Sequence, residues 1–191
     1  MKKCLAVLSL LLLLSGCGGG NPELNKAMEF RKELITSEGC SFDAKITADY
    51  GDDLHTFSLA CQGDSQGNLT FTVTEPQSIR GITGTIGNTG GQLTYTETAL
   101  QFDLLTDQQL SPVSAPWVFL RTLREGYLLN AGKEEGFIRM EARDSYEEDA
   151  LHVDLWLTEE GVPRRGEILF RGRRILTLET GNFTLHGGGQ V

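Results

Sequence analysis

Short runs that alternate apolar and polar residues fill most of the chain after residue 68, and turn residues separate them at close intervals. Such runs are typical of strands, and connections this short favour an antiparallel meander over a parallel α/β sheet. The predicted strands are Leu69–Glu75, Ile79–Ile86, Gln92–Thr96, Ala99–Leu104, Gly136–Arg143, Leu151–Leu157, Glu167–Arg171, Ile175–Glu179 and Asn182–His186. Twist coils a sheet of about ten strands, so the expected fold class is mainly β (α+β), with one strongly curved antiparallel sheet that forms an open half-barrel.

Two segments are predicted to be helices that cover the concave face of this sheet. The first begins at Asn21-Pro22-Glu23, with a capping asparagine and a proline in the first turn, and extends to about Ser37. The second lies between Ser114 and Arg124, where apolar residues recur at helical spacing. It follows the long connection after Thr106, so it is expected as an insertion between strands.

The N-terminus has the pattern of an export signal. Met1-Lys2-Lys3 is basic, and the apolar run Leu5–Leu14 is shorter than the ~20 residues that span a bilayer. The following Leu14-Ser15-Gly16-Cys17 resembles the lipobox of bacterial lipoproteins. The resemblance implies that residues 1–16 are removed and that Cys17, acylated, anchors the chain on the extracytoplasmic side of a membrane of the bacterial envelope. The alternative is an ordinary secretory signal in which Cys17 is incidental.

The charge of the chain limits its partners. There are 26 acidic and 17 basic residues and a net charge of -9, which argues against binding to nucleic acid or adsorption to anionic headgroups. Membrane attachment is therefore expected from the lipid on Cys17. Residues 17–21 then form the lipidated cysteine and a glycine-rich tether with a reach of ~15 Å. Residues 22–186 are expected to form a single domain, and residues 187–191 a frayed tail.

The segment between Cys40 and Cys61 predicts a hairpin. Apolar residues at positions 42, 44, 46 and 48 alternate with polar ones, and a turn centred on Tyr50-Gly51 places Phe42 opposite Leu59 and Cys40 opposite Cys61. Because an exported protein can be oxidised, this register predicts a structural Cys40–Cys61 disulfide. The alternative is a pair of reduced thiols in the core. No C-x-x-C motif is present, which argues against a catalytic redox pair.

The order of these elements resembles the LolA/LolB lipoprotein carriers and the related LppX-type lipid carriers. The resemblance covers most of residues 22–186 and is carried by the N-terminal helix, by a meander that opens with Phe42-Asp43-Ala44, by the helical insertion after Pro112, by strands around Gly161-Val162-Pro163 and by a final strand at Asn182-Phe183. It implies an unclosed barrel whose helices form a lid over an apolar cavity for acyl chains. The anchored LolB and LppX types fit a chain with a lipobox better than LolA, which is soluble.

Candidate ligand-binding residues are large apolar groups on the inserted helix and on nearby strands. They are Trp117, Leu120, Leu123, Phe71, Val73 and Ile82. The alternative is that these side chains fill an ordinary core, since periodicity does not separate a pocket from a core. A second candidate is an anion or lipid-headgroup contact at Arg171, Arg173 and Arg174, with solvation or pairing to acids as the alternative.

No motif points to catalysis. His55, His152 and His186 lie on separate predicted strands without metal-ligand spacing, and there is no G-x-S-x-G motif. We therefore expect no enzymatic activity, no metal and no cofactor. The leading hypothesis is a membrane-anchored lipoprotein that holds a lipid or other apolar ligand in its half-barrel. The alternative is an envelope scaffold or sensor with a filled core that acts through a protein partner.

Overall fold

The computed structural model describes residues 21–49, 51, 54–95, 98–102, 105–106, 109–147 and 150–187. The predicted signal peptide, Cys17, residues 18–20 of the tether and residues 188–191 of the tail lie outside this part of the chain.

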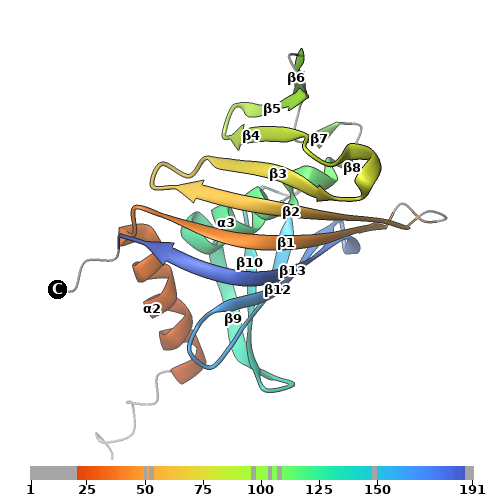
Figure 1. Ribbon diagram of the computed structural model, residues 1–191. Coiled ribbons are helices and arrows are strands. Elements are labelled where there is room, and N and C mark those ends of the chain that lie inside the picture. The colour runs from red at the N-terminus through yellow and green to blue at the C-terminus, as the bar shows by residue number, and fades with distance from the viewer. Residues whose placement is uncertain are drawn as a thin grey trace, which may run out of the picture.

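One large antiparallel sheet dominates the described residues (Figure 1). Its eleven strands have the order β6-β5-β4-β3-β2-β1-β13-β12-β11-β10-β9, and β7 and β8 form a separate two-stranded ribbon. The strands are β1 (Gly39–Asp49), β2 (Leu54–Asp64), β3 (Leu69–Glu75), β4 (Thr83–Gly87), β5 (Gly90–Tyr95), β6 (Thr98–Phe102), β7 (Leu105–Thr106), β8 (Gln109–Leu110), β9 (Tyr127–Glu134), β10 (Phe137–Arg143), β11 (His152–Leu157), β12 (Pro163–Phe170) and β13 (Arg173–His186). The sheet is not closed, because among the described strands β6 and β9 each have a neighbour on one side only. The predicted open half-barrel is confirmed.

Several strand boundaries differ from the sequence prediction. A turn of 3-10 helix, η1 (Gln77–Ile79), replaces the start of the strand predicted at Ile79. The two strands predicted at the C-terminus are one long strand, β13, which pairs with both β1 and β12. Strand β9 was missed. Its exposed positions break the simple alternation, since it is an edge strand with one free side.

Two α-helices cover the concave face of the sheet (Figure 1). Helix α2 (Pro22–Thr36) contacts β9 and β10, and α3 (Ala115–Glu125), which follows the 3-10 turn η2 (Pro112–Ser114), contacts β2, β12 and β13. The side chain of Asn21 accepts hydrogen bonds from the amides of Glu23 and Leu24, at 3.0 and 3.1 Å, so the predicted N-cap is confirmed. Both predicted helices are present.

The first hairpin has the predicted faces but not the predicted register. Asp49 pairs with Leu54, so Phe42 lies opposite Cys61 and Cys40 lies opposite Gly63. The pairing is displaced by two residues from the prediction, which leaves every side chain on its expected face because strands alternate with a period of two.

The predicted Cys40–Cys61 disulfide is wrong, because both cysteines are buried and free. In the observed register the two residues are diagonal neighbours on one face, and diagonal side chains stand ~7–8 Å apart. A disulfide needs Cβ atoms ~3.8 Å apart. Burial raises the pKa of the Cys40 thiol to about 11 and also raises the pKa of Cys61. The alternative of two core thiols therefore describes the structure.

These thiols should be unreactive until the protein unfolds. With Cys4 and Cys17 replaced by serine, we expect no alkylation of the native chain at pH 8, where a pKa near 11 leaves about one thiol in a thousand ionised. Unfolding in denaturant without reductant should expose both thiols, and mass spectrometry should show two labels. An unfolded chain that takes up no label would mean that the two cysteines are linked.

Candidate functional site

Helix α3 is the inserted helix that the sequence predicted as a lid, and it packs directly on the sheet. Two strand glycines allow this approach: a Cβ at Gly63 would lie 2.9 Å from Cδ1 of Leu120, and one at Gly166 would lie 2.6 Å from Cδ2 of Phe119. The indole Nε1 of Trp117 donates a hydrogen bond to the carbonyl of Gly67, at 3.0 Å. The lid helix therefore lies in contact with the strands beneath it.

The structure places most of the predicted apolar ligand residues in the core. Trp117, Leu120, Leu123, Phe71 and Val73 are buried members of one apolar cluster. Ile82 is half-buried and packs against the edge of that cluster. A hollow between α2, α3 and the β1–β2 hairpin has a volume of about 10 Å³, which is at most the space of a single water. A ligand that reached these five residues would have to displace α3.

Arg31 of α2 fixes α3 in place. Its guanidinium donates hydrogen bonds to the carbonyls of Thr122, Leu123 and Gly126, at 3.0, 2.6 and 2.8 Å. The carbonyl of Thr122 also accepts a hydrogen bond from the amide of the C-cap residue Gly126, at 2.9 Å, and a cation at this end of α3 interacts favourably with the helix dipole. Burial lowers the pKa of Arg31. Sequence analysis missed this contact, since nothing in the pattern places Arg31 beside a helix that follows about 90 residues later.

The apolar face of the sheet continues beyond the part that α3 covers. On β5 and β6, Leu93 lies directly opposite Leu100, and Tyr95 and Phe102 share their face. Exposure increases toward the edge: Leu93 and Phe102 are half-buried, Tyr95 is 56% exposed and Leu100 is 64% exposed. We call these four residues, with Ile82, the apolar rim. The alternation in the strands predicted at Gln92–Thr96 and Ala99–Leu104 could have indicated this rim, but of its residues only Ile82 was a predicted ligand residue.

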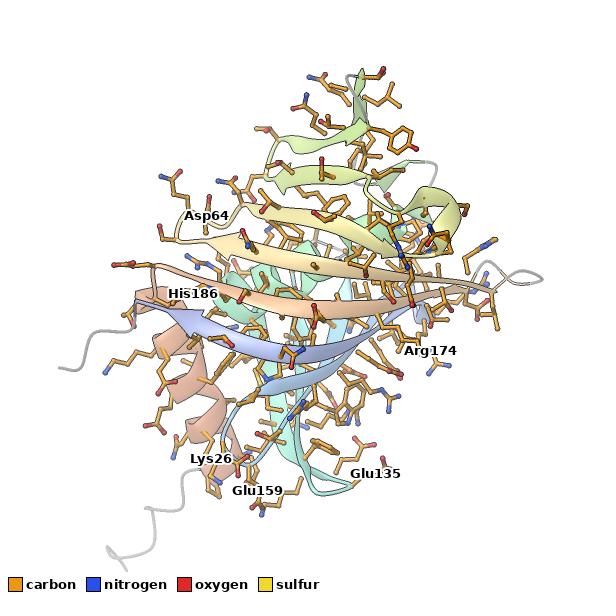
Figure 2. The ribbon with its side chains drawn as sticks, viewed as in Figure 1. Lys26, Asp64, Glu135, Glu159, Arg174 and His186 are labelled. Carbon is orange, nitrogen blue, oxygen red and sulfur yellow. The ribbon has the colours of Figure 1, made fainter. Side chains whose placement is uncertain are left out.

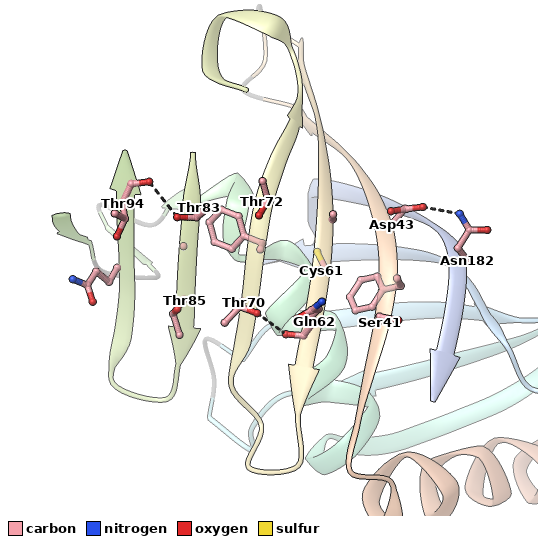
Figure 3. Close-up of a pocket in the computed structure, with 15 residues that line it drawn as sticks. Ser41, Asp43, Cys61, Gln62, Thr70, Thr72, Thr83, Thr85, Thr94 and Asn182 are labelled. Carbon is pink, nitrogen blue, oxygen red and sulfur yellow. Dashed lines mark hydrogen bonds between the residues drawn. The ribbon is translucent and has the colours of Figure 1, made fainter. Parts of the chain in front are cut away.

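The opposite, outer face of β1–β5 is hollowed and polar (Figure 3). A hollow of about 460 Å³ is lined by hydroxyl and amide groups, which include Gln62, Thr70 and Gln92. Asp43 is the charged residue of its lining, and Asn182 donates a hydrogen bond of 2.7 Å to it. Phe71 belongs to this lining and Val73 to that of a neighbouring hollow, but both side chains are buried. The outer face offers hydrogen bonds and does not suit an acyl chain.

The predicted arginine cluster is engaged with protein groups. Arg173 lies 3.6 Å from Asp49, and Arg174 lies 3.1 Å from the buried carboxylate of Glu167, which Arg165 also contacts. The guanidinium of Arg171 lies over the ring of Phe170, at 5.1 Å from its centre. A lipid phosphate would compete with these carboxylates, so the headgroup contact stays a prediction.

Within the described ranges, no group of three or more His, Cys, Asp or Glu side chains is placed to hold a metal ion. No helix among the same residues is long and apolar enough to cross a bilayer.

Comparison with known proteins finds similarity of structure but not of sequence. No protein family and no curated protein matches the sequence. Among solved structures, a putative outer membrane lipoprotein-sorting protein domain from Vibrio parahaemolyticus matches with a TM-score of 0.49 and 10% identity, over 86% of this chain and 93% of that one. A LolA superfamily protein from Nitrosomonas europaea matches with a TM-score of 0.44 and 11% identity, over 84% and 93% of the two chains.

The Mycobacterium tuberculosis lipoprotein LppX also matches, with a TM-score of 0.41 and 9% identity, over 85% of this chain and 93% of that one. The chain resembles LolA-type proteins. At 9 to 11% identity, no residue role carries over from these structures, so the function has to be argued from this chain's own residues.

Proposed function

We propose that the protein is a bacterial envelope lipoprotein, anchored through acylated Cys17, that binds an acyl chain or a similar apolar ligand without chemical change. The observation that supports binding is the apolar rim, where the core face of the sheet reaches solvent at Tyr95 and Leu100. A long apolar ligand that lies along this face would cover surface that water now contacts. Burial of apolar surface contributes about 25 cal/mol per Å².

The rim is the part of the apolar face that a ligand can reach without unfolding the lid. Deeper binding, against Trp117, Leu120 and Leu123, would require α3 to move away from the strands on which it packs, β2, β12 and β13. The hydrogen bonds from Arg31 to the end of α3 oppose that movement. We therefore propose that a ligand first contacts the rim. It extends under α3 only if α3 separates from the sheet.

Uptake of a fluorescent fatty acid by the purified chain carrying Cys17→Ser tests the proposal. Leu100→Asp should weaken binding about tenfold or more, because one buried leucine contributes roughly 1.5–3 kcal/mol. Leu54→Asp is the matched control, since Leu54 is 70% exposed on β2 and does not belong to the rim. The control variant should bind as the parent does.

Two results would contradict lipid binding. One is the absence of fatty-acid uptake by the parent chain together with no lipid in a solvent extract. The other is equal loss of binding in the Leu100 and Leu54 variants, which would indicate non-specific adsorption to exposed leucines.

The packed core favours a second candidate function, an envelope scaffold or sensor that acts through a protein partner. Five of the six apolar candidates are buried in one apolar cluster, and the hollow beneath the lid has a volume of about 10 Å³. In this case the chain would carry no lipid besides its anchor.

A further inference from the structure

The two edges of the large sheet differ in how they are protected. At the β9 edge, α2 packs against the strand, the side-chain amide of Asn21 donates a 2.7 Å hydrogen bond to the carbonyl of Ala131, and Lys133 and Glu134 add charge. The other edge, β6, is the sequence Thr-Ala-Leu-Gln-Phe, with neither a charge nor a proline. The backbone N–H and C=O groups on the free side of an edge strand pair readily with another chain. Natural edge strands therefore usually carry charged residues or prolines that prevent this pairing.

The described part of the chain begins at Asn21, on the β9 side of the molecule. Asn21, which follows the tether, contacts β9, and the sheet order places β6 at the far edge. Lys26, Glu135 and Glu159 gather at the end of the molecule where α2 begins (Figure 2), whereas β6 lies at the opposite end (Figure 1). Four residue steps join Cys17 to Asn21 and span ~14 Å at most, so the tether holds the α2 end close to the membrane and β6 away from it.

A bilayer is a poor occupant for the β6 edge. The backbone groups on the free side of an edge strand find no hydrogen-bond partner in hydrocarbon, and open sheet edges do not occur there. The edge also points away from the membrane that carries the anchor. Exposed Leu100 therefore faces an aqueous compartment.

A second copy of the chain in the same membrane is also disfavoured. Pairing of two identical β6 edges requires a two-fold axis at the edge, and this axis turns the second molecule upside down. Its α2 end and its anchor would then point away from the membrane that holds the first copy. A tether of ~14 Å would then have to reach past the second copy's own sheet and past the first copy to the membrane.

We infer that β6 is a docking edge for an extended strand of a different protein, which approaches from the aqueous side opposite the anchor. The partner strand would pair with Thr98–Phe102 and place its apolar side chains beside Leu100, as in recognition by strand addition. The orientation of this edge rests on the proposed anchor at Cys17. The strand pairing rests on β6 alone.

A synthetic strand tests the pairing. The probe is a fluorescent eight-residue peptide that alternates valine and threonine, with one lysine at each end, added to the full-length chain carrying Cys17→Ser. We expect saturable binding by anisotropy and slower hydrogen exchange of the amides in residues 98–102. Leu100→Lys should weaken binding at least tenfold, whereas Leu54→Lys should leave it unchanged.

A peptide methylated at alternate backbone nitrogens keeps the side chains but loses ladder hydrogen bonds, so it should bind at least tenfold more weakly. Equal binding of the two peptides, or protection that falls on strands other than β6, would overturn the docking edge. Self-association through β6 in place of peptide binding would also overturn it.

Fluorophore depth tests the orientation. The acylated mature chain in phosphatidylglycerol–phosphatidylethanolamine vesicles is labelled at Gln101→Cys on β6 or at Glu135→Cys in the β9–β10 turn, since the buried Cys40 and Cys61 should not react. A headgroup-attached quencher should quench the label at position 135 and leave the label at position 101 bright. Quenching at position 101 would overturn the outward orientation.

Failure of the proposed function gives a different result. Absence of fatty-acid uptake with peptide binding intact would reject the lipid ligand and keep the docking edge. A mature chain that fails to bind vesicles would reject both the anchor and the orientation, while the peptide measurement would still decide the pairing.

Discussion

Replacement of Leu123 by alanine should lower the free energy of unfolding by about 2–5 kcal/mol. The Leu123 side chain is fully buried, at 0% exposure, between α3 and the sheet. Truncation removes apolar contacts and leaves a cavity, because the surrounding side chains relax only in part. Helix α3 cannot close the gap by sliding, since Arg31 holds its last carbonyls. Urea denaturation followed by far-ultraviolet circular dichroism measures the loss.

Leu54→Ala is the matched control for this substitution. Leu54 is 70% exposed, so the same truncation should change the unfolding free energy by no more than about 0.5 kcal/mol. A small effect at both positions would mean that Leu123 lines a space that is empty in solution. That result would favour the cavity implied by the sequence resemblance over the packed core.

Cys17→Ser should move the protein from the membrane fraction to the soluble fraction of bacteria that express the full chain. Acylation contributes about 0.8 kcal/mol per buried methylene, and two chains give stable attachment where one is marginal. The net charge of -9 does not favour adsorption to anionic headgroups, so we expect the lipid to supply the attachment. Fractionation, together with the intact mass of the purified protein, measures the effect.

Cys4→Ser is the control for this experiment. Cys4 lies within the predicted signal and should be absent from the mature chain, so its replacement should change neither the fractionation nor the mature mass. A parent chain that carries no diacylglycerol and appears in the medium would contradict the anchor.

The first hairpin shows how far sequence reasoning extends. Alternation at positions 40–49 assigned each side chain to the correct face, yet the register was displaced by two residues and the disulfide that depended on it does not form. Registers two residues apart bury the same face, so the alternation does not distinguish them. In the register that the structure adopts, Gly63 of β2 lies next to Leu120 of α3, which is far away in the sequence.

The candidate ligand site shows a similar limit of reasoning from the sequence pattern. Trp117 and Leu123 were correctly placed on an inserted helix, but periodicity could not decide whether that helix covers a cavity or closes a core. The apolar rim was overlooked because Leu93 and Leu100 have ordinary strand patterns, and their exposure depends on where α3 ends relative to β5 and β6. The unequal edges at β6 and β9 also become visible only when the strand order is known.

The amino-acid sequence by itself determined the antiparallel curved sheet, its two covering helices and the face on which each strand residue of the first hairpin lies. These properties follow from local periodicity, capping residues and turns, which act within a few residues of one another. Only the tertiary structure decided the hairpin register, the free thiols, the filled space beneath α3 and the exposed edge at β6. Each of these depends on contacts between segments far apart in the chain, where packing selects among arrangements that satisfy the same local pattern.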